Sequence, residues 1–321
     1  MTQSAAPYFC DDSGLYFHPV SPDHQPSALS HLLTGKVDTQ GIAAAARFQR
    51  YALTQDMDLK HCYIGTRDLV GKEIILSGLV VPCRGRAGMF FLSPLQTKNQ
   101  QRPAAQLVQH ITAHIDTTQI NLLQVLLQAK EDLARETFQL AQFTPLAKLL
   151  YMQRLSKAQD QPSALSLAQQ DITITPWSES NRSHFRRAIL ASYKNTADCP
   201  SLVGLRDIDD IIAGHQPPVN FKPELWFALH QEDQPVGVLL LSDLIEQRSL
   251  EIVYLGVSDN WRGRSIAKQL LAHAIGLCKG LNRSHLILAV DENNSPALGL
   301  YRAVDFLPSV RKHALIKALK A

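Results

Sequence analysis

The chain has few cysteines, and their arrangement would neither bind a metal nor build a disulfide framework. Its 321 residues include five, which are widely separated and form no C-x-x-C pair. Structural zinc sites and small disulfide-stabilised domains need paired or closely spaced cysteines. His110 and His114 have helical i, i+4 spacing, but no obvious third ligand accompanies them, which favours a solvated helix face. We therefore expect reduced thiols and no metal site.

Long apolar runs and a strong charge of one sign are also missing. No apolar segment approaches the roughly 20 residues that cross a bilayer, and the start, MTQSAAPYFCDDSG, lacks the features of a signal peptide. The net charge is only +3, with 15 Lys and Arg against 12 Asp and Glu in residues 1–158, and 17 of each in the remainder. Nucleic-acid-binding domains usually carry a clear basic excess. We expect a cytoplasmic protein with no nucleic-acid partner and no membrane partner.

The chain does have an internal repeat. Phe138 and Phe143 lie 163 positions before Tyr301 and Phe306. The same offset aligns apolar stretches that read as strands, MFFLSP (89–94) with IVYLGV (252–257) and LQVLL (123–127) with LILAV (286–290). A pattern that keeps one register over several elements indicates a duplicated domain.

The repeat and the length predict two domains. We assign residues 1–158 to the first and residues 171–321 to the second, and the polar, proline-containing segment 159–170 to a linker. Alternating strand and helix patterns predict the α/β class, with a mixed, mostly antiparallel sheet flanked by helices in each domain. In the second domain we expect strands at 171–177, 224–230, 236–244, 251–257, 285–290 and 311–319, and helices at 182–194, 206–215, 265–280 and 296–304.

The loop NWRGRS (260–265) joins the strand at 251–257 to the helix that follows it. Amide groups at a helix start have no intrahelical partner, and together with the helix dipole they favour a bound phosphate. Arg262, Arg264 and Lys268 add positive charge nearby. An ordinary turn with solvated arginines explains this stretch equally well.

In context, residues 171–321 resemble the GCN5-related N-acetyltransferases, the GNAT family. The family loop R/Q-x-x-G-x-G/A is matched by Arg262 and Ala267, with Ser265 where glycine is usual. The later signature N-x-x-A-x-x-L-Y-x-x-x-G-F has Asp305 in place of its glycine, and is otherwise matched by Asn294, Ala297, Leu300, Tyr301 and Phe306. The serine could donate to a phosphate or cap the helix. The aspartate is expected in a left-handed turn.

The resemblance implies two tandem GNAT-like domains and acetyl-CoA, or another acyl-CoA, as co-substrate, without a metal. It places the pantetheine arm along Leu255 and Val257, and Asn294 on the opposite side of the cofactor. The pyrophosphate is expected near Arg262, on the amides of Gly263, Arg264, Ser265, Ile266 and Ala267.

The same resemblance implies a reaction mechanism and its catalytic residues. A free amine would attack the thioester directly, with Tyr301 as general acid for the departing thiolate, although a packed aromatic is the alternative. Similarity to the corresponding strand of histone acetyltransferases makes Glu251 a candidate general base, and a solvated carboxylate is the alternative. The acceptor, a small-molecule or peptide amine, is expected near residues 192–218. Candidate contacts there, which could equally be structural, are Tyr193, Asp198, Asp209 and Asp210.

The first domain lacks several of these residues. At the shared offset Tyr301 becomes Phe138, Arg262 becomes Asn99 and Ser265 becomes Arg102. Since phenylalanine cannot donate a proton, we interpret residues 1–158 as a degenerate, non-catalytic copy. The alternative function for the whole chain is a non-catalytic acyl-CoA sensor or interaction module, which would bind the cofactor without acceptor-dependent release of CoA.

Overall fold

The computed structural model describes residues 8–10, 14–68, 73–161 and 171–319. The chain divides into two compact units. Unit 1 consists of Met1–Leu146 and His313–Ala321, and unit 2 consists of Ala147–Lys312. Each unit has a mixed sheet with helices on both faces, which confirms the predicted fold class.

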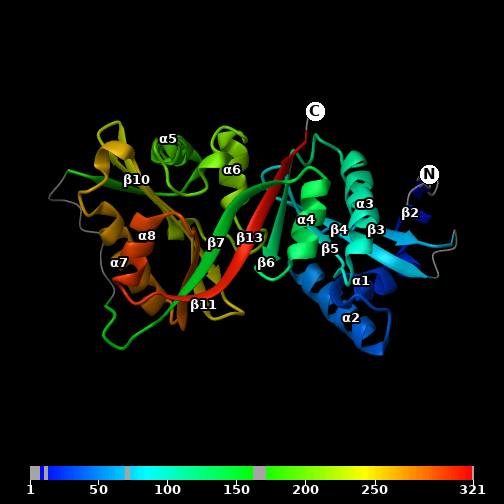
Figure 1. Ribbon diagram of the computed structural model, residues 1–321. Helices are drawn as coiled ribbons and strands as arrows, with labels where there is room; N and C mark the ends of the chain where they lie inside the picture. The colour runs from blue at the N-terminus through cyan, green and yellow to red at the C-terminus, as the bar shows by residue number, and fades with distance from the viewer. Residues whose placement is uncertain (1–7, 11–13, 69–72, 162–170, 320–321) are drawn as a thin grey trace. The chain divides into compact units, whose positions relative to one another are not determined.

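The sheet of unit 1 has the strand order β1-β2-β3-β4-β5-β6, followed by the end of β13. Its pairs from β1 to β5 are antiparallel, and β5 pairs with β6 in parallel. Figure 1 shows α1 and α2 on one side of β3–β5, and α3 and α4 on the other. The strands are β1 (Tyr8–Cys10), β2 (Leu15–Pro19), β3 (His61–Thr66), β4 (Ile74–Cys83), β5 (Ala87–Leu92) and β6 (Leu122–Gln128), and the helices are α1 (Gln25–Thr34), α2 (Thr39–Thr54), α3 (Gln101–Ala113) and α4 (Asp132–Leu140).

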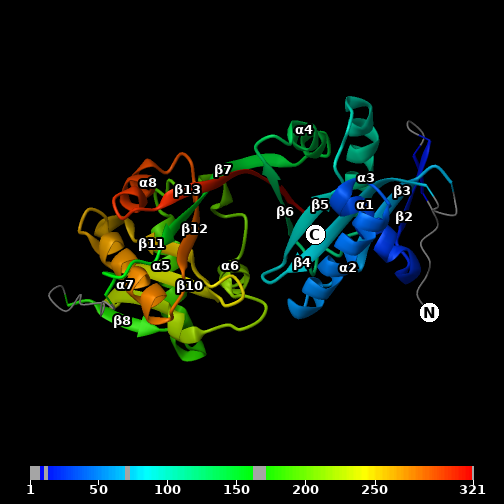
Figure 2. The ribbon, with the colours of Figure 1, turned by 90° about the horizontal axis from the view of Figure 1, so that it is seen from below.

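The sheet of unit 2 has the strand order β8-β9-β10-β11-β12-β7-β13, with β8 at its edge (Figure 2). Strands β8 to β11 are antiparallel, β11 pairs with β12 in parallel, and β12 pairs with β7 antiparallel. The strands are β7 (Thr144–Leu155), β8 (Thr173–Pro176), β9 (Trp226–Gln231), β10 (Gln234–Leu244), β11 (Ser249–Val257), β12 (His285–Asp291) and β13 (Leu307–Ala318), and the helices are α5 (Arg182–Tyr193), α6 (Ile208–His215), α7 (Ile266–Gly280) and α8 (Ser295–Arg302).

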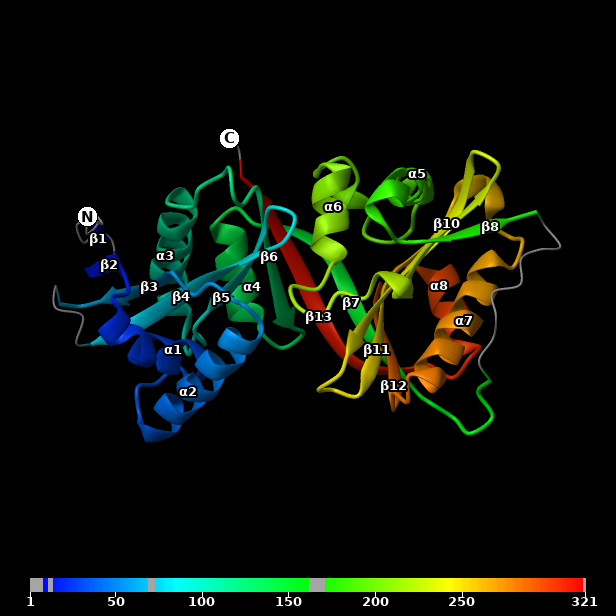
Figure 3. The same ribbon diagram turned by 180° about the vertical axis from the view of Figure 1, so that it is seen from behind.

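Alternating side chains of β10 build two separate cores in unit 2. Leu239 and Leu241 pack with residues of α7 and α8, whereas Val238 and Leu240 pack with residues of α5 and α6. Successive side chains of a strand point to opposite faces of the sheet. The two helix pairs therefore cover opposite faces (Figure 3).

The predicted repeat is confirmed by the element boundaries. Strand β6 and strand β12 are 163 positions apart at both ends, and so are β7 and β13. Helix α4 and helix α8 begin at the same offset. The strand order β2 to β6 in unit 1 also matches the order β8 to β12 in unit 2.

The two repeats exchange their last strands. Strand β7, which ends the first repeat, pairs with β12 of unit 2 from Leu149–Asp291 to Leu155–His285. The end of β13 lies beside β6 in unit 1, where Leu315 is buried in the core with α3 and α4. The units therefore differ from the simple division into residues 1–158 and 171–321.

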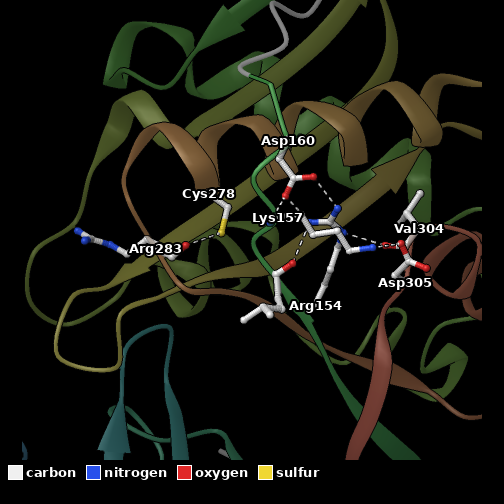
Figure 4. Close-up of polar contacts among 8 residues, drawn as sticks. Arg154, Lys157, Asp160, Cys278, Arg283, Val304 and Asp305 are labelled. Carbon is white, nitrogen blue, oxygen red and sulfur yellow. Dashed lines mark hydrogen bonds and ion pairs between the residues drawn. The ribbon is translucent and has the colours of Figure 1, made fainter.

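A buried ion pair fixes the chain where it leaves β7 (Figure 4). Arg154 donates two hydrogen bonds of 2.7 Å to the carboxylate of Asp160, and both side chains are almost fully buried, 7% and 6% exposed. Arg154 also donates to the carbonyl of Val304, next to the turn at Asp305. Of the expected linker 159–170, residues 162–170 lie outside the described residues.

The described residues bear on the expectations for cysteines, metals and membranes. Cys62, Cys83, Cys199 and Cys278 take part in no disulfide. In the described part of the chain, no group of three or more His, Cys, Asp or Glu side chains could hold a metal ion. None of its helices is long and apolar enough to cross a membrane.

Candidate functional site

The site forms where strands β11 and β12 part. Their parallel pairing runs only from Ser249–His285 to Ile252–Leu288. Opposite β10, Leu240 pairs with Tyr254 and Leu241 with Ile252, so Val253 is an extra residue on β11. A bulge of this kind bends the strand that carries it. Beyond Ile252, β11 has an edge that does not pair with β12.

A cleft of about 540 Å³ occupies this opening. It lies within unit 2, between the parted strands and the beginnings of α7 and α8. The loop after α5, at 195–198, forms another wall. The cleft therefore brings together both sequence motifs and the loop that the sequence associated with the acceptor.

The loop before α7 has two residues in the left-handed backbone region. Gly263 has φ +75° and Ser265 has φ +61°. Left-handed backbone costs a residue with a side chain roughly 1–2 kcal/mol, which explains why glycine suits the position of Ser265. Ser265 is the N-cap residue of α7, but its side chain makes no capping hydrogen bond. The suggested capping role of the serine is therefore wrong, whereas Ser265, Ile266 and Ala267 do line the cleft.

Arg262 holds this loop against the end of α5. Its guanidinium donates to the carbonyls of Ser192, Lys194 and Asn195 at 2.9 Å, and to the carbonyl of Val257 at 3.2 Å. These bonds satisfy carbonyls that a helix end leaves unpaired. The charge of Arg262 thus serves mainly to position the loop.

Positive charge at the loop comes also from Arg264 and Lys268. The Arg264 guanidinium lies over the ring of Trp261, 4.7 Å from its centroid, in a cation–π contact. Lys268 and Trp261 both line the cleft, and Lys268 is exposed. This end of the cleft can therefore receive an anion.

Tyr301 and Asn294 lie on the α8 side of the cleft. Asn294 is the N-cap of α8, and its side chain accepts a 3.3 Å hydrogen bond from the amide of Ala297. Tyr301 is 7% exposed and lines the cleft. Burial, and secondarily the charge of Asp198, raise the pKa of the Tyr301 phenol, so it stays protonated at neutral pH.

Asp198 lines the same cleft from the loop after α5. Its Oδ1 accepts a 3.0 Å hydrogen bond from the amide of Asp291, at the end of β12, and Asn294 also bonds to it. Burial raises the pKa of Asp198, and the charge of Asp291 acts in the same direction. Of the four residues suggested for the acceptor, Asp198 is the one that reaches the cleft lining.

The other suggested residues lie elsewhere. Asp209 forms ion pairs with Arg182 and Arg186 at the start of α6, and neither Asp209 nor Asp210 lines the cleft. Glu251 lies on the paired part of β11, opposite Ser242 and Ile287, and is also outside the lining. Burial raises its pKa.

Tyr193 belongs to an aromatic group that the sequence did not reveal. Its ring contacts Tyr254 edge-on, with centroids 6.0 Å apart, and His215 stacks on the other ring at 5.5 Å. The Tyr254 hydroxyl lies 2.7 Å from Ser192 Oγ, which itself donates to the carbonyl of Ile189. Alternation counted from Ile252 would place Tyr254 on the face of α7 and α8, and only the extra residue Val253 turns it toward α5. His215 lies too far away in the sequence to be assigned.

The corresponding strands of unit 1 also part, since β5 pairs with β6 only from Ala87–Leu122 to Met89–Gln124, but β5 has no bulge opposite β4. There β4 pairs with β5 in unbroken register from Gly78–Leu92 to Cys83–Ala87. Phe138, at the position of Tyr301, is completely buried and packs edge-on against Phe90 and Phe143. Its side chain serves the core of unit 1.

Sequence comparison relates the residues that form the cleft to a known family. The sequence pattern of the acetyltransferase (GNAT) family matches residues 192–306. Two curated relatives, the peptidyl-lysine N-acetyltransferases YjaB of Salmonella typhimurium and Escherichia coli, are 33% and 32% identical over 89 residues, which is 27% of this chain. The chain spans about half the length of these relatives, 54% and 53%.

Solved structures extend the similarity to the whole fold. A GCN5-related N-acetyltransferase from Sphaerobacter thermophilus aligns over 97% of both chains, with a TM-score of 0.58 and 16% identity. A tandem GNAT protein from the clavulanic acid biosynthesis pathway aligns over 95% of this chain and 98% of its own, with a TM-score of 0.50 and 10% identity. The acetyltransferase (GNAT) family pattern therefore covers residues 192–306, which contain the cleft, and the whole chain has a fold similar to that of a tandem GNAT protein.

Proposed function

We propose that unit 2 is an N-acetyltransferase, which transfers an acetyl group from acetyl-CoA, or a related acyl group, to a primary amine. The observation that carries the proposal is the cleft between the parted strands β11 and β12, with the α7 helix start at one side and Tyr301 at another. An extended acyl carrier with an anionic end needs these features together.

The residues present fit such a carrier. The unpaired edge of β11 offers the backbone groups of Leu255 and Val257 for strand-like hydrogen bonds. Amides from Gly263 to Ala267, at the start of α7, suit the pyrophosphate, and Lys268 adds charge. Asn294 bounds the cleft from α8. Acetyl-CoA supplies the activated acyl group, and these residues bind and orient it.

Tyr301 is proposed as the general acid. Its raised pKa keeps the phenol protonated until a thiolate needs the proton. Glu251, the base implied by family resemblance, has a raised pKa that suits a base near neutral pH. Because Glu251 lies outside the cleft lining, it could act only through an intervening water.

The acceptor is proposed to be a small-molecule or peptide amine. The curated relatives are named for peptidyl-lysine, and a lysine side chain is a primary amine of this kind. Unit 1 is proposed to be non-catalytic, because Phe138 replaces the phenol and is fully buried. We expect one cofactor per chain.

The proposal is tested by native mass spectrometry with acetyl-CoA, followed by an assay of CoA release with lysine peptides and small amines. The Tyr301→Phe variant should keep the same cofactor count and affinity, while its turnover falls by about 10²–10⁴-fold, the usual contribution of a general acid. Failure of the wild-type chain to bind acetyl-CoA would overturn the proposal. Binding without amine-dependent CoA release would instead support the sensor, and unchanged turnover in Tyr301→Phe would remove the assigned acid.

A further inference from the structure

We propose that Asp198 binds the ammonium group of the acceptor and is the general base that removes its proton. This inference rests on the proposed function and identifies the acceptor as a cationic amine. Among the described residues that line the cleft, Asp198 is the only one with a carboxylate, and none is a histidine. A base that acts directly on the acceptor must come from this lining.

Asp198 is fixed in place beside the proposed acid. Besides the bond from the Asp291 amide, it takes a hydrogen bond from Asn294, the residue that caps α8. The amide of Cys199 in turn donates to the Asp291 carboxylate at 3.3 Å. These bonds join the loop after α5 to the end of β12. Tyr301 is near enough for the charge of Asp198 to raise its pKa.

The groups around Asp198 favour the binding of a positively charged ligand. Besides burial, the negative charge of Asp198 raises the pKa of the neighbouring phenols and thiol, which belong to Tyr193, Tyr254, Tyr301 and Cys199. The pKa of Asp198 is in turn raised by burial and by the carboxylate of Asp291. Within the described residues, no cation is among the causes that shift its pKa. An acceptor ammonium would therefore supply the missing charge.

The raised pKa of Asp198 also suits its function as a base. Burial disfavours the carboxylate, so its affinity for a proton is closer to what neutral-pH catalysis needs. The base must be deprotonated to act. Activity should therefore rise as the pH increases through the pKa of Asp198, and this rise should lie above the range of an ordinary aspartate.

The reaction balances with two protein groups. The ammonium proton passes to the Asp198 carboxylate, and the amine nitrogen forms a bond to the acyl carbon. As the carbon–sulfur bond breaks, the proton of Tyr301 passes to the sulfur. The second proton that the nitrogen loses in becoming an amide returns to the Tyr301 phenolate, and Asp198 releases its proton to solvent. Protonation of Asp198 removes the negative charge that raised the pKa of Tyr301. The phenol thus becomes a stronger acid when the leaving group needs its proton.

The test compares the full-length wild-type chain with Asp198→Asn, using acetyl-CoA and a lysine peptide. Asparagine keeps the carbonyl that accepts the Asp291 amide, so acetyl-CoA affinity should remain within about twofold of wild type. Turnover should fall by about 10²–10⁴-fold, and the acidic limb of the pH profile should disappear. Asp233→Asn, in a residue whose side chain is 94% exposed, is the matched control and should match wild type.

A second acceptor shows whether the defect of Asp198→Asn comes from the loss of a base or from a disturbed structure. Hydroxylamine is already neutral at the assay pH and needs no base, so the defect of Asp198→Asn should shrink at least tenfold with it. If Asp198→Asn fails to fold, the wild-type chain still tests the proposal, because with hydroxylamine the acidic limb should follow the titration of hydroxylamine itself and not that of Asp198.

The outcomes are distinct. Normal turnover in Asp198→Asn, or an equal defect with both acceptors, would overturn the assignment of Asp198 alone. Loss of the acidic limb in Glu251→Gln but not in Asp198→Asn would transfer the role of base to Glu251. No turnover of any amine by the wild-type chain would overturn the proposed function, and this inference with it.

Discussion

At the scale of single residues, both departures from the family motifs occupy left-handed backbone. Ser265 has φ +61° and Asp305 has φ +67°. The prediction of a left-handed turn at Asp305 is confirmed, and the aspartate also pairs with Lys157 at 2.6 Å. Glycine adopts this conformation without steric cost, which gives a physical reason for its place in the family pattern.

Replacement of Ser265 by glycine should therefore strengthen the loop. Ser265→Gly removes a conformational strain of about 1–2 kcal/mol, partly offset by about 0.5–1 kcal/mol of extra chain entropy in the unfolded state. We expect a free energy of unfolding equal to or up to about 1.5 kcal/mol above wild type, and a lower Kd for acetyl-CoA in calorimetry. Ser265→Ala retains the strain and is the control. Weaker binding in Ser265→Gly would show that the hydroxyl itself contacts the cofactor.

Motif residues were easier to predict than the residues that complete the cleft. Tyr301 and Asn294 reach the cleft because their spacing on one short helix fixes their relation to each other. Asp198 reaches it through a loop, whose path depends on hydrogen bonds to the distant residue Asp291. Local sequence carries no signal for such a contact.

At the scale of elements, strands and helices with clear periodicity were predicted well. The stretch LILAV lies within β12, and the apolar stripe after Ser265 forms α7. The extra residue at Val253 could not be predicted, because a bulge is a property of two paired strands and not of one. That extra residue lies where β11 leaves β12.

The Arg154–Asp160 pair is the element-scale contact that we expect to matter most for stability. Asp160→Asn leaves the buried guanidinium without its counter-charge and should lower the free energy of unfolding by about 3–5 kcal/mol in urea titrations. Asp305→Asn, at the exposed pair in the same group (Figure 4), is the control and should leave the free energy of unfolding close to that of wild type.

Acid should weaken the same contact. The hydrogen-bonded Arg154 side chain lowers the pKa of Asp160, so its stabilisation is full above the ordinary aspartate pKa and is lost as the pH falls through the lowered value. In Asp160→Asn this part of the acid dependence should vanish. An unchanged acid transition would contradict the stabilising role of the pair.

At the scale of the whole molecule, the exchange of β7 and β13 makes each unit depend on a strand from the other repeat. Leu315, near the end of β13, is 1% exposed and lies in the core of unit 1. Within this unit, Thr144 at the beginning of β7 donates to the carbonyl of Ile316 on β13, and Lys317 of β13 donates to the carbonyl of Ala141 at the end of α4. The C-terminal residues of the chain thus stabilise its N-terminal half.

A chain that ends at Lys312 should consequently lose stability in unit 1. Hydrogen exchange should show lost amide protection in β6, next to the missing strand, while β11 and the paired part of β12 keep theirs. Leu315→Ala should weaken the same region by about 2–5 kcal/mol without removing the strand. Equal protection of β6 in the shortened and full-length chains would contradict the strand exchange.

The sequence by itself determined the duplication, the fold class and the motif residues, because repeat spacing and hydrophobic periodicity are local properties of the chain. The tertiary structure decided the strand exchange, the parting of β11 and β12 and the place of Asp198 in the cleft. Each of these depends on pairing between segments far apart in the sequence. Since β6 and β12 each offer an edge to the last strand of either repeat, only the folded chain selects the partner.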